Sequence, residues 1–527
     1  MRLKSTKINP KFLLAFKEKK MGQYILGIDN GNTVSKAALF DVHGKEIAIA
    51  SCKVDTKFPH PGWTERSMDM LWQSTASAIR EVLVKSGIRS EEIAGIGNTG
   101  HGNGIYLLDR HGQPLRNGIQ SMDSRAAGIL EQWNRHNLHA RVFPYTVQSF
   151  WPAQPNALLA WIKKCEPENY ERIGAILMCK DYIKYRLTGE ISSDFTDMSG
   201  SSLMDVPRMT YSHELMALYG IDEVYDALPP LKQCFEVAGQ VSRAAAEETG
   251  LAAGTPVVGG IFDIDASAVG CGAVHAGQAC IIAGTWSINE VISEQPLVDP
   301  NLFMTSMFAA PGLFLSTEAS ATSAANLEWF VTQCCGDERA EAKRRGISVY
   351  DVCNEEVAGL APESTNIIFH PFLFGSNVQP TARAGFYGFA GWHTRAHLLR
   401  ALYEGVVFCH LSHIEKLRAA GAQIKSVRLT GGGSRSPVWT QMFADTIQVP
   451  IEISDGTEIG ARGAALSAGI GTGIYRNYTE AVEQAVSIVR IQEPFSTNTS
   501  HYMARFSEYE HLVMVMQEPW ERLNKLG

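Results

Sequence analysis

Each half of this chain contains a short apolar strand that ends in a loop of small or acidic residues. The first strand runs from Tyr24 to Asp29 and ends in Asn30-Gly31-Asn32, and the second runs from Ser426 to Thr430 and ends in three glycines. Two similar strand ends suit two similar lobes with a cleft between them, so the pattern favours a two-domain α/β protein. The length of 527 residues also exceeds what a single core usually holds.

Strands and helices alternate around these two strand ends. Residues 36–41 form a second apolar run after the Gly/Asn turn, which predicts a β-hairpin, and residues 45–52 extend the sheet. Periodicity predicts further strands and helices, with strands at 93–97, 105–109 and 279–283 and helices at 68–86, 394–416 and 505–525. We expect an N-terminal domain over residues 21–270 and a C-terminal domain over residues 271–527.

The first twenty residues stand apart from this pattern. They carry Arg2 and several lysines around a short apolar patch at residues 12–16. The patch is shorter than the core of a signal peptide, and no small-residue cleavage site follows it. We expect residues 1–20 to form a disordered extension.

Composition excludes several classes of protein. A net charge of -8 argues against a nucleic-acid-binding protein, whose affinity rests on neutralising phosphates. No apolar run reaches the ~18 residues that a membrane span needs. The ten cysteines include no CxxC pair, which favours reduced thiols in a cytoplasmic protein. A homodimer is the default expectation for assembly.

Three strand-end loops are candidates for binding phosphate. The P-loop pattern GxxxxGK[ST] is absent. Asp29 could hold water around Mg²⁺ at the first strand end, while the turn at Asn32 and the Thr33 hydroxyl could face a phosphate; an ordinary hairpin turn explains the same residues. The other two loops follow strands in the second half, where small residues let a base or phosphate approach the backbone: Gly284, Thr285, Gly431, Gly432 and Gly433.

An acidic pair provides the candidate for proton transfer. Asp263 follows a Gly-bounded apolar strand, where a carboxylate is well placed to act as a general base. Asp265 is its rival, although Asp265 also suits the simpler role of capping a helix that begins near Ala266. Residues 95–100 match GxGxxG, but a strand follows them where a dinucleotide site needs a helix.

Taken together, these segments resemble the FGGY family of carbohydrate kinases, within the actin/hexokinase-like ATPase superfamily. The resemblance covers roughly residues 23–520 and rests on the order of seven motifs: GIDNGNTVSKA at 27, HGNGIYLLD at 101, MDSRA at 122, GGIFDIDASAVG at 259, GTWS at 284, GFYGFAGWHTRAHLLRALYEG at 385 and LTGGGSRSPVWTQMFAD at 429. Other segments, at 60–72, 318–330 and 370–377, look most like the branch of L-xylulose and 3-keto-L-gulonate kinases.

The resemblance implies two ribonuclease-H-like domains with ATP and sugar meeting in the cleft. It puts the family's catalytic base on Asp263, although Phe262 and Ile264 replace the usual neighbours of that base. It implies ATP binding by the glycines at 431–433 and assistance by Mg²⁺. The sugar-side residues that it implies are His101, Asn103, Asp123 and Arg125.

The sequence therefore predicts an ATP-dependent kinase that phosphorylates a hydroxyl of a small ketose. L-Xylulose, a related ketopentose or 3-keto-L-gulonate is the expected acceptor, with erythritol, ribulose and D-xylulose as alternatives. An ATP-hydrolysing chaperone or filament protein is a competing hypothesis, as is a sugar-binding regulator without catalysis. The acidic positions at 29 and 263 argue against a regulator, because a binder needs no base.

Overall fold

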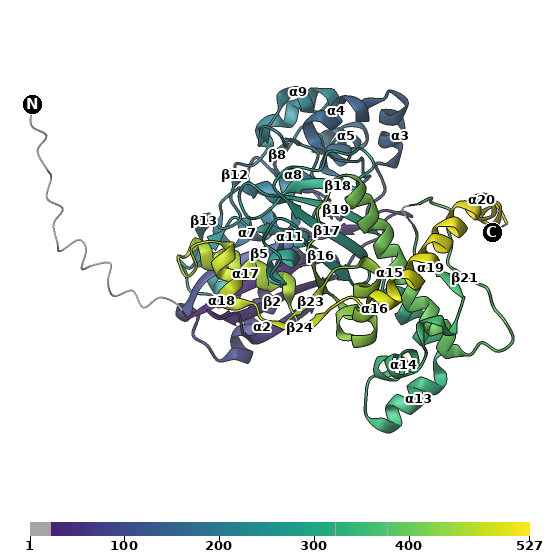
Figure 1. Ribbon diagram of the computed structural model, residues 1–527. Helices are drawn as coiled ribbons and strands as arrows, with labels where there is room; N and C mark the ends of the chain where they lie inside the picture. Colours follow the sequence, from purple (N-terminus) through teal and green to yellow (C-terminus); the bar gives the residue numbers. More distant parts are fainter. Residues whose placement is uncertain (1–22, 322, 377, 527) are drawn as a thin grey trace, which may run out of the picture.

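The computed structural model describes residues 23–321, 323–376 and 378–526, and its core consists of two seven-stranded sheets (Figure 1). The first sheet is built from strands between residues 24 and 262, and the second from strands between residues 278 and 492. The predicted extension over residues 1–20 lies outside the described residues. None of the described helices is long and apolar enough to cross a membrane.

The first sheet begins with the predicted hairpin. β1 (Tyr24–Asn30) pairs antiparallel with β2 (Val34–Asp41), and β2 pairs antiparallel with β3 (Glu46–Lys53). β5 (Ile93–Gly100) lies parallel to β1 on its other side, so the carboxyl ends of β1 and β5 meet at one edge of the sheet. The remaining strands are β13 (Val237–Gln240), β14 (Pro256–Val258) and β15 (Ile261–Phe262).

The second sheet combines antiparallel and parallel pairing in the same way. β16 (Gln278–Ala283) pairs antiparallel with β17 (Ser287–Ser293) and parallel with β22 (Ser426–Thr430). The loops after β16 and β22, which carry the predicted phosphate-binding residues, therefore leave the sheet at the same edge. The other strands are β18 (Met304–Met307), β19 (Phe314–Ser320), β23 (Ile451–Ser454) and β24 (Ile488–Gln492).

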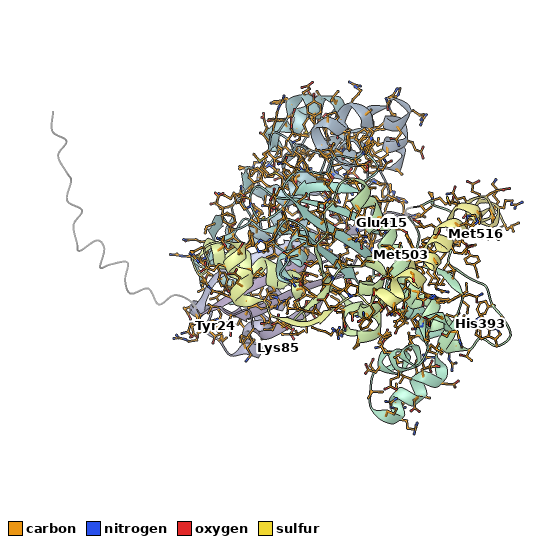
Figure 2. All side chains as sticks on the ribbon, in the orientation of Figure 1. Tyr24, Lys85, His393, Glu415, Met503 and Met516 are labelled. Atoms are coloured by element: carbon orange, nitrogen blue, oxygen red, sulfur yellow. The ribbon has the colours of Figure 1, made fainter. Side chains whose placement is uncertain are left out.

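Long helices cover the outer faces of the sheets. α2 (Met68–Ser86) packs on β2 and β3, and α15 (Arg395–Ala419) packs beside β17 and β19. The sequence predicts one C-terminal helix over 505–525; the chain instead forms α19 (Ser496–Val515) and α20 (Gln517–Asn524), which meet at Met516 (Figure 2).

Shorter elements complete the two domains. The other helices are α3 (Ala127–Arg135), α4 (Leu138–Thr146), α5 (Pro155–Cys165), α6 (Pro167–Tyr170), α7 (Cys179–Thr188), α8 (Phe195–Gly200), α9 (His213–Tyr219), α10 (Arg243–Thr249), α11 (Asp263–Gly270), α12 (Ala325–Cys334), α13 (Gly336–Arg345), α14 (Val349–Ala358), α16 (Pro437–Ile447), α17 (Ile459–Gly471) and α18 (Tyr478–Ala485). The minor strands are β4 (Glu65–Arg66), β6 (Tyr106–Asp109), β7 (Gly118–Ile119), β8 (Ile173–Leu177), β9 (Ser193–Asp194), β10 (Met204–Asp205), β11 (Thr210–Tyr211), β12 (Leu231–Lys232), β20 (Ile368–His370) and β21 (Gly385–Tyr387).

The two sheets are joined through helices α11 and α17, which pack against each other. α17 also packs on β1 and β5 of the first sheet, although it belongs to the second half of the chain. Glycines allow this approach: a Cβ at Gly463 would lie 2.0 Å from the carbonyl oxygen of Ala266, and a Cβ at Gly97 would lie 1.8 Å from that of Ala464. Because both obstacles are backbone atoms, a side chain at Gly463 must push α17 away from α11, and one at Gly97 must push α17 away from β5.

We predict that Gly97→Ala lowers the free energy of unfolding by about 3 kcal/mol, because its new methyl group overlaps the Ala464 carbonyl. Gly128→Ala is the matched control, since a Cβ at Gly128 on α3 meets nothing within 4 Å. Urea unfolding followed by circular dichroism measures both variants. Equal midpoints for the two variants would show that the interface between α17 and the first sheet is not tightly packed.

Candidate active site

Three neighbouring cavities share residues at the carboxyl ends of the sheet strands. The inner cavity, of about 220 Å³, is lined by residues of both halves, including His101, Asp263 and Thr317. The middle cavity, of about 690 Å³, shares Trp286 with the inner cavity. The outer cavity, of about 450 Å³, shares Thr285 with the middle one. The loop after β16 therefore runs past all three, which together form one cleft.

Asp263 is the carboxylate that lines the inner cavity. It is the first residue of α11 and directly follows β15, so the strand end fixes its backbone at the cavity wall. Burial, together with the negative charges of Asp29 and Asp197, raises the pKa of Asp263 to about 8. A carboxylate with a pKa near neutrality is a stronger base than an ordinary aspartate, so it suits removal of a proton from a hydroxyl.

Asp265 does not reach this cavity. Its side chain is fully buried, and its Oδ1 accepts a hydrogen bond of 2.9 Å from the backbone N–H of Ala309. Burial, with the charge of Asp194, raises the pKa of Asp265 well above its usual value. The alternative role of Asp265 as a helix cap is wrong, because α11 begins at Asp263 and Asp265 lies within its first turn. Asp265 instead joins α11 to the loop after β18.

A buried charge network lies behind Asp263, and our sequence analysis did not identify it. The Lys180 ammonium lies 2.9 Å from a carboxylate oxygen of Asp181 and 3.2 Å from one of Asp197, and it also contacts the carboxylate of Asp194. Burial, with the charge of Asp194, raises the pKa of Asp197 to about 7. The available signal was a charged pair, Lys180-Asp181, shortly after the apolar strand β8.

His101 and Asn103 provide neutral polar groups at the inner cavity. Burial and the nearby Arg66 lower the pKa of His101 to about 3, so its imidazole is uncharged and lies 2.9 Å from the Tyr106 hydroxyl. Asn103 adopts a left-handed backbone conformation with φ 57°. Its Oδ1 is buried and has no hydrogen-bond partner among the described residues. An acceptor in that state favours a ligand that brings a hydroxyl donor.

Asp123 and Arg125 lie behind the wall of this cavity and are not among its described lining residues. Arg125 donates two hydrogen bonds of 2.9 Å to Asp123, and its guanidinium lies 4.3 Å from the centre of the Trp63 ring. Asp123 also accepts a 2.6 Å hydrogen bond from the backbone of Thr64. The pair therefore fixes the backbone next to Met122, the residue before Asp123. Met122 itself lines the inner and middle cavities.

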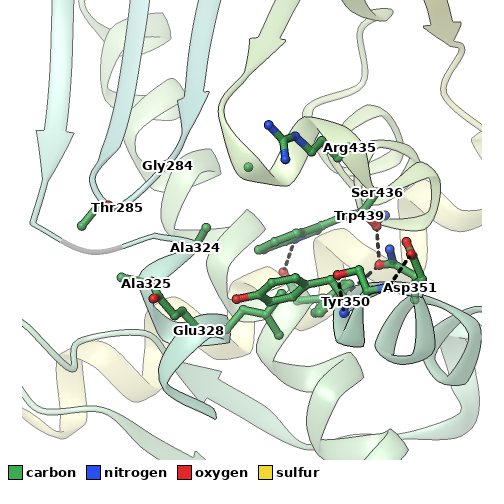
Figure 3. A pocket seen from close by; sticks show the side chains of 15 residues that line it. Gly284, Thr285, Ala324, Ala325, Glu328, Tyr350, Asp351, Arg435, Ser436 and Trp439 are labelled. Carbon is green, nitrogen blue, oxygen red and sulfur yellow. Dashed lines mark hydrogen bonds between the residues drawn. The ribbon is translucent and has the colours of Figure 1, made fainter. Parts of the chain in front are cut away.

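The outer cavity is formed by the second half of the chain (Figure 3). Gly284 and Thr285 lie at one side of the cavity and Arg435 lies at the other. Gly432 also lines this cavity. A Cβ at Gly432 would meet nothing within 4 Å, whereas one at Gly431 or Gly433 would lie within 3 Å of Ala283. Of the three predicted glycines, Gly432 is thus the one that leaves open space beside the cavity.

Aromatic residues that the sequence analysis missed line the same cavity. The Tyr350 and Trp439 side chains lie along it, and Trp439 stacks on Tyr403 with ring centres 4.5 Å apart. Asn354 Oδ1 accepts hydrogen bonds from the Tyr403 hydroxyl at 3.0 Å and the Ser436 hydroxyl at 2.7 Å. This rigid apolar wall suits a flat heterocycle. No local sequence pattern indicated Tyr350, because α14 is distant from the glycine loop in the chain.

The remaining predicted residues lie at the end of β1 and in the turn after it. Asn32 lines the inner cavity, whereas Asp29 and the exposed Thr33 are not among the described residues lining the three cavities. Burial raises the pKa of Asp29, and Lys36 partly opposes that rise. No group of three His, Cys, Asp or Glu residues in the described part of the chain could hold a metal alone. Mg²⁺ bound with a nucleotide needs only one or two carboxylates, so Asp29 fits that role.

Comparison with known proteins agrees with this arrangement. The model of the N-terminal domain of the FGGY family of carbohydrate kinases matches residues 24–270, and the model of its C-terminal domain matches residues 279–472. The L-xylulose/3-keto-L-gulonate kinase of Escherichia coli K12 is 38% identical, over 94% of this chain and 98% of its own. A probable L-xylulose kinase of Pasteurella multocida is 39% identical, over 94% of this chain and 99% of its own.

Solved structures show the same two-domain architecture. The xylulose kinase of Rhodospirillum rubrum is 27% identical, superposes with a TM-score of 0.84 and covers 94% of this chain and 100% of its own. The gluconate kinase of Lactobacillus acidophilus superposes with a TM-score of 0.85 at 22% identity, covering 95% of this chain and 99% of its own, which supports the fold. The predicted α/β fold with two actin-like ATPase domains is confirmed, and so is a sugar kinase that takes its phosphoryl group from ATP. On both family models and nearly full-length relatives, the chain belongs to the FGGY family of carbohydrate kinases.

Proposed function

We propose that this kinase phosphorylates a hydroxyl of a small ketose, with Asp263 as the general base. The observation that carries the proposal is the inner cavity, where one carboxyl group of raised pKa stands among neutral polar groups from both sheets. Relatives named L-xylulose kinase support a ketopentose as the acceptor. Erythritol, ribulose and D-xylulose are the alternatives.

The reaction follows from the order of the cavities. The sugar occupies the inner cavity, with the reacting hydroxyl at Asp263, and the nucleotide base occupies the outer cavity beside Tyr350 and Gly432. The triphosphate then extends past Gly284 and Thr285 toward the sugar. As the sugar oxygen bonds to the γ-phosphorus, the bond to the β-phosphate oxygen breaks, ADP leaves, and the hydroxyl proton passes to Asp263.

Mg²⁺ bound with ATP would neutralise charge on the transferring phosphoryl group. We propose that Asp29 holds it, and that Asn32 and Thr33 contact the phosphates from the turn after β1. In this scheme residues 21–270 bind the sugar and the phosphates, and residues 271–527 bind the nucleotide. His101 and Asn103 contact the sugar directly, while Asp123 and Arg125 hold the adjoining wall. A cytoplasmic location and a homodimer stay predictions.

A screen of ADP release over the pentuloses, 3-keto-L-gulonate, glycerol and erythritol tests the function. We expect a ketose to accelerate ATP turnover at least ~100-fold, about 2.7 kcal/mol in barrier, because a kinase completes its site only around the acceptor. The control is the same assay without sugar. Fast ATP hydrolysis that no acceptor stimulates would contradict the proposal.

Asp263→Asn should lower kcat by 10²–10⁴, roughly 3–5.5 kcal/mol in barrier, while ATP binding persists. Asp265→Asn is the matched control: its side-chain oxygen can still accept the bond from Ala309, and it lies outside the cavity. Steady-state kinetics and calorimetric ATP titration measure both variants. If Asp265→Asn abolished turnover while Asp263→Asn stayed active, the base would be misassigned.

Gly432→Val should raise the KM for ATP at least ~10-fold and leave the KM for sugar within about twofold. The open space beside Gly432 accepts the side chain without unfolding the loop, and that space is where we place the nucleotide. Gly128→Val is the control, because that glycine is equally open but lies on α3. An unchanged KM for ATP in the folded variant would remove the nucleotide from this cavity.

A further inference from the structure

The inner and middle cavities carry no lysine or arginine among their described lining residues. The polar groups of the inner cavity, apart from Asp263, are the uncharged side chains of Asn32, His101, Asn103, Ser121, Trp151, Trp286 and Thr317. His101 belongs to this set because its lowered pKa keeps the imidazole neutral. A ligand in this cavity therefore meets hydrogen-bonding groups but no positive charge from a side chain of the wall.

Three buried basic side chains behind the cavity wall, Arg66, Arg125 and Lys180, already have partners. Both Nη atoms of Arg66 donate to the backbone carbonyl of Gly31, and Nη2 also donates to that of Asn32. Arg125 is held by Asp123 and by Glu65 at 3.0 Å. Lys180 is surrounded by three carboxylates. Turning any of them toward a ligand would leave a buried carboxylate or carbonyl unpaired, which is costly.

The charges around the inner cavity are mostly negative. Asp263 lines the inner cavity itself, and Glu328 lines the middle one. Asp29 and Asp197 act on Asp263 from behind the wall. A carboxylate on the ligand would add another negative charge to this region, and it would favour the protonated form of Asp263, in which the base cannot accept a proton.

The rest of the wall is apolar. Phe262 and Ile264 flank the base, and Met304 and Ile288 come from the second sheet. Beside them, the hydroxyl of Thr317, which pairs with Met304 across β18 and β19, is buried without a hydrogen-bond partner among the described residues, and so is Asn103 Oδ1. Such groups are satisfied by hydroxyls or a carbonyl, whereas an ionised carboxylate facing this surface would lose its hydration without a counter-charge.

Resting on the proposed ketose kinase activity, we propose that the inner cavity selects an uncharged ketose and rejects a sugar acid, with Thr317 of the nucleotide-binding half as a specificity-determining contact to a sugar hydroxyl. The Escherichia coli relative, as its name states, acts on L-xylulose and on 3-keto-L-gulonate. Because its inner cavity offers no positive side chain among the described lining residues, we expect this chain to phosphorylate neutral L-xylulose more efficiently than the anionic 3-keto-L-gulonate.

The test compares kcat/KM for L-xylulose and for 3-keto-L-gulonate at saturating ATP. We expect kcat/KM to be at least ~100-fold higher for the neutral sugar, because the carboxylate of 3-keto-L-gulonate would be buried without a counter-charge. Equal values, or a preference for the sugar acid, overturn the inference and leave the kinase proposal standing. If neither compound nor any other ketose is phosphorylated, the proposed function fails and the inference falls with it.

Paired variants at Met122 test the physical reason. Met122 borders the inner and middle cavities and is 42% exposed, so a longer polar side chain fits there. Met122→Lys should shift the ratio of kcat/KM at least ~10-fold toward 3-keto-L-gulonate, whereas Met122→Gln, of similar shape and no charge, should not. Equal shifts in the two variants overturn the charge argument.

Thr317→Val tests the new contact, because valine keeps the shape of threonine and removes its hydroxyl. We expect the KM for L-xylulose to rise at least ~5-fold, with the KM for ATP and the melting temperature unchanged. Thr305→Val is the control: Thr305 is also buried, but its hydroxyl is already bonded to Leu297 and Ser316 at 2.9 Å. An unchanged KM for L-xylulose in Thr317→Val overturns the assignment of Thr317.

Discussion

The close contact between α11 and α17 is the constraint on which the rest of the structure depends. A Cβ at Gly270 would lie 2.0 Å from the carbonyl of Ile459, and one at Gly463 would lie equally close to that of Ala266, so the two helices approach backbone to backbone. Arg462 reinforces the contact with a 2.8 Å hydrogen bond to the Gly270 carbonyl. The glycines therefore let the two halves of the molecule pack closely, with backbone rather than side chains at the contact.

The same helices carry the groups that the chemistry requires. Asp263 begins α11, and α17 begins beside Asp29, whose Oδ2 lies 3.1 Å from the position of a Cβ on Gly460. Glu458, which precedes α17, pairs with Lys36 of β2 at 2.8 Å. Any rotation of one half about this contact therefore changes the spacing between the carboxylates and the phosphate loops. In our scheme, closure of the cleft and assembly of the catalytic groups are one motion.

Sequence reasoning reached the parts of the fold that local patterns encode. The hairpin, the strand ends at 283 and 430 and the helix at 68–86 follow from apolar runs and turn residues within a few positions of each other. The wall behind the site could not be predicted in that way, because the network of Lys180, Asp194 and Asp197 forms only when α7 and α8 meet. The tyrosine of the outer cavity, Tyr350, is likewise brought to Gly432 by tertiary packing alone.

The buried acids create a conflict that the site must resolve. Asp263 gains basicity from its burial and from the negative charges of Asp29 and Asp197, but the same causes keep it protonated near neutral pH in the free protein, since they raise its pKa to about 8. A neutral sugar leaves that balance unchanged, and positive charge delivered with the nucleotide near Asp29 would lower the pKa of Asp263 once both substrates are present. A sugar acid would push the pKa the other way. The burial and the negative charges that together make Asp263 a strong base therefore also argue for an uncharged acceptor, so basicity and substrate selection share one electrostatic origin.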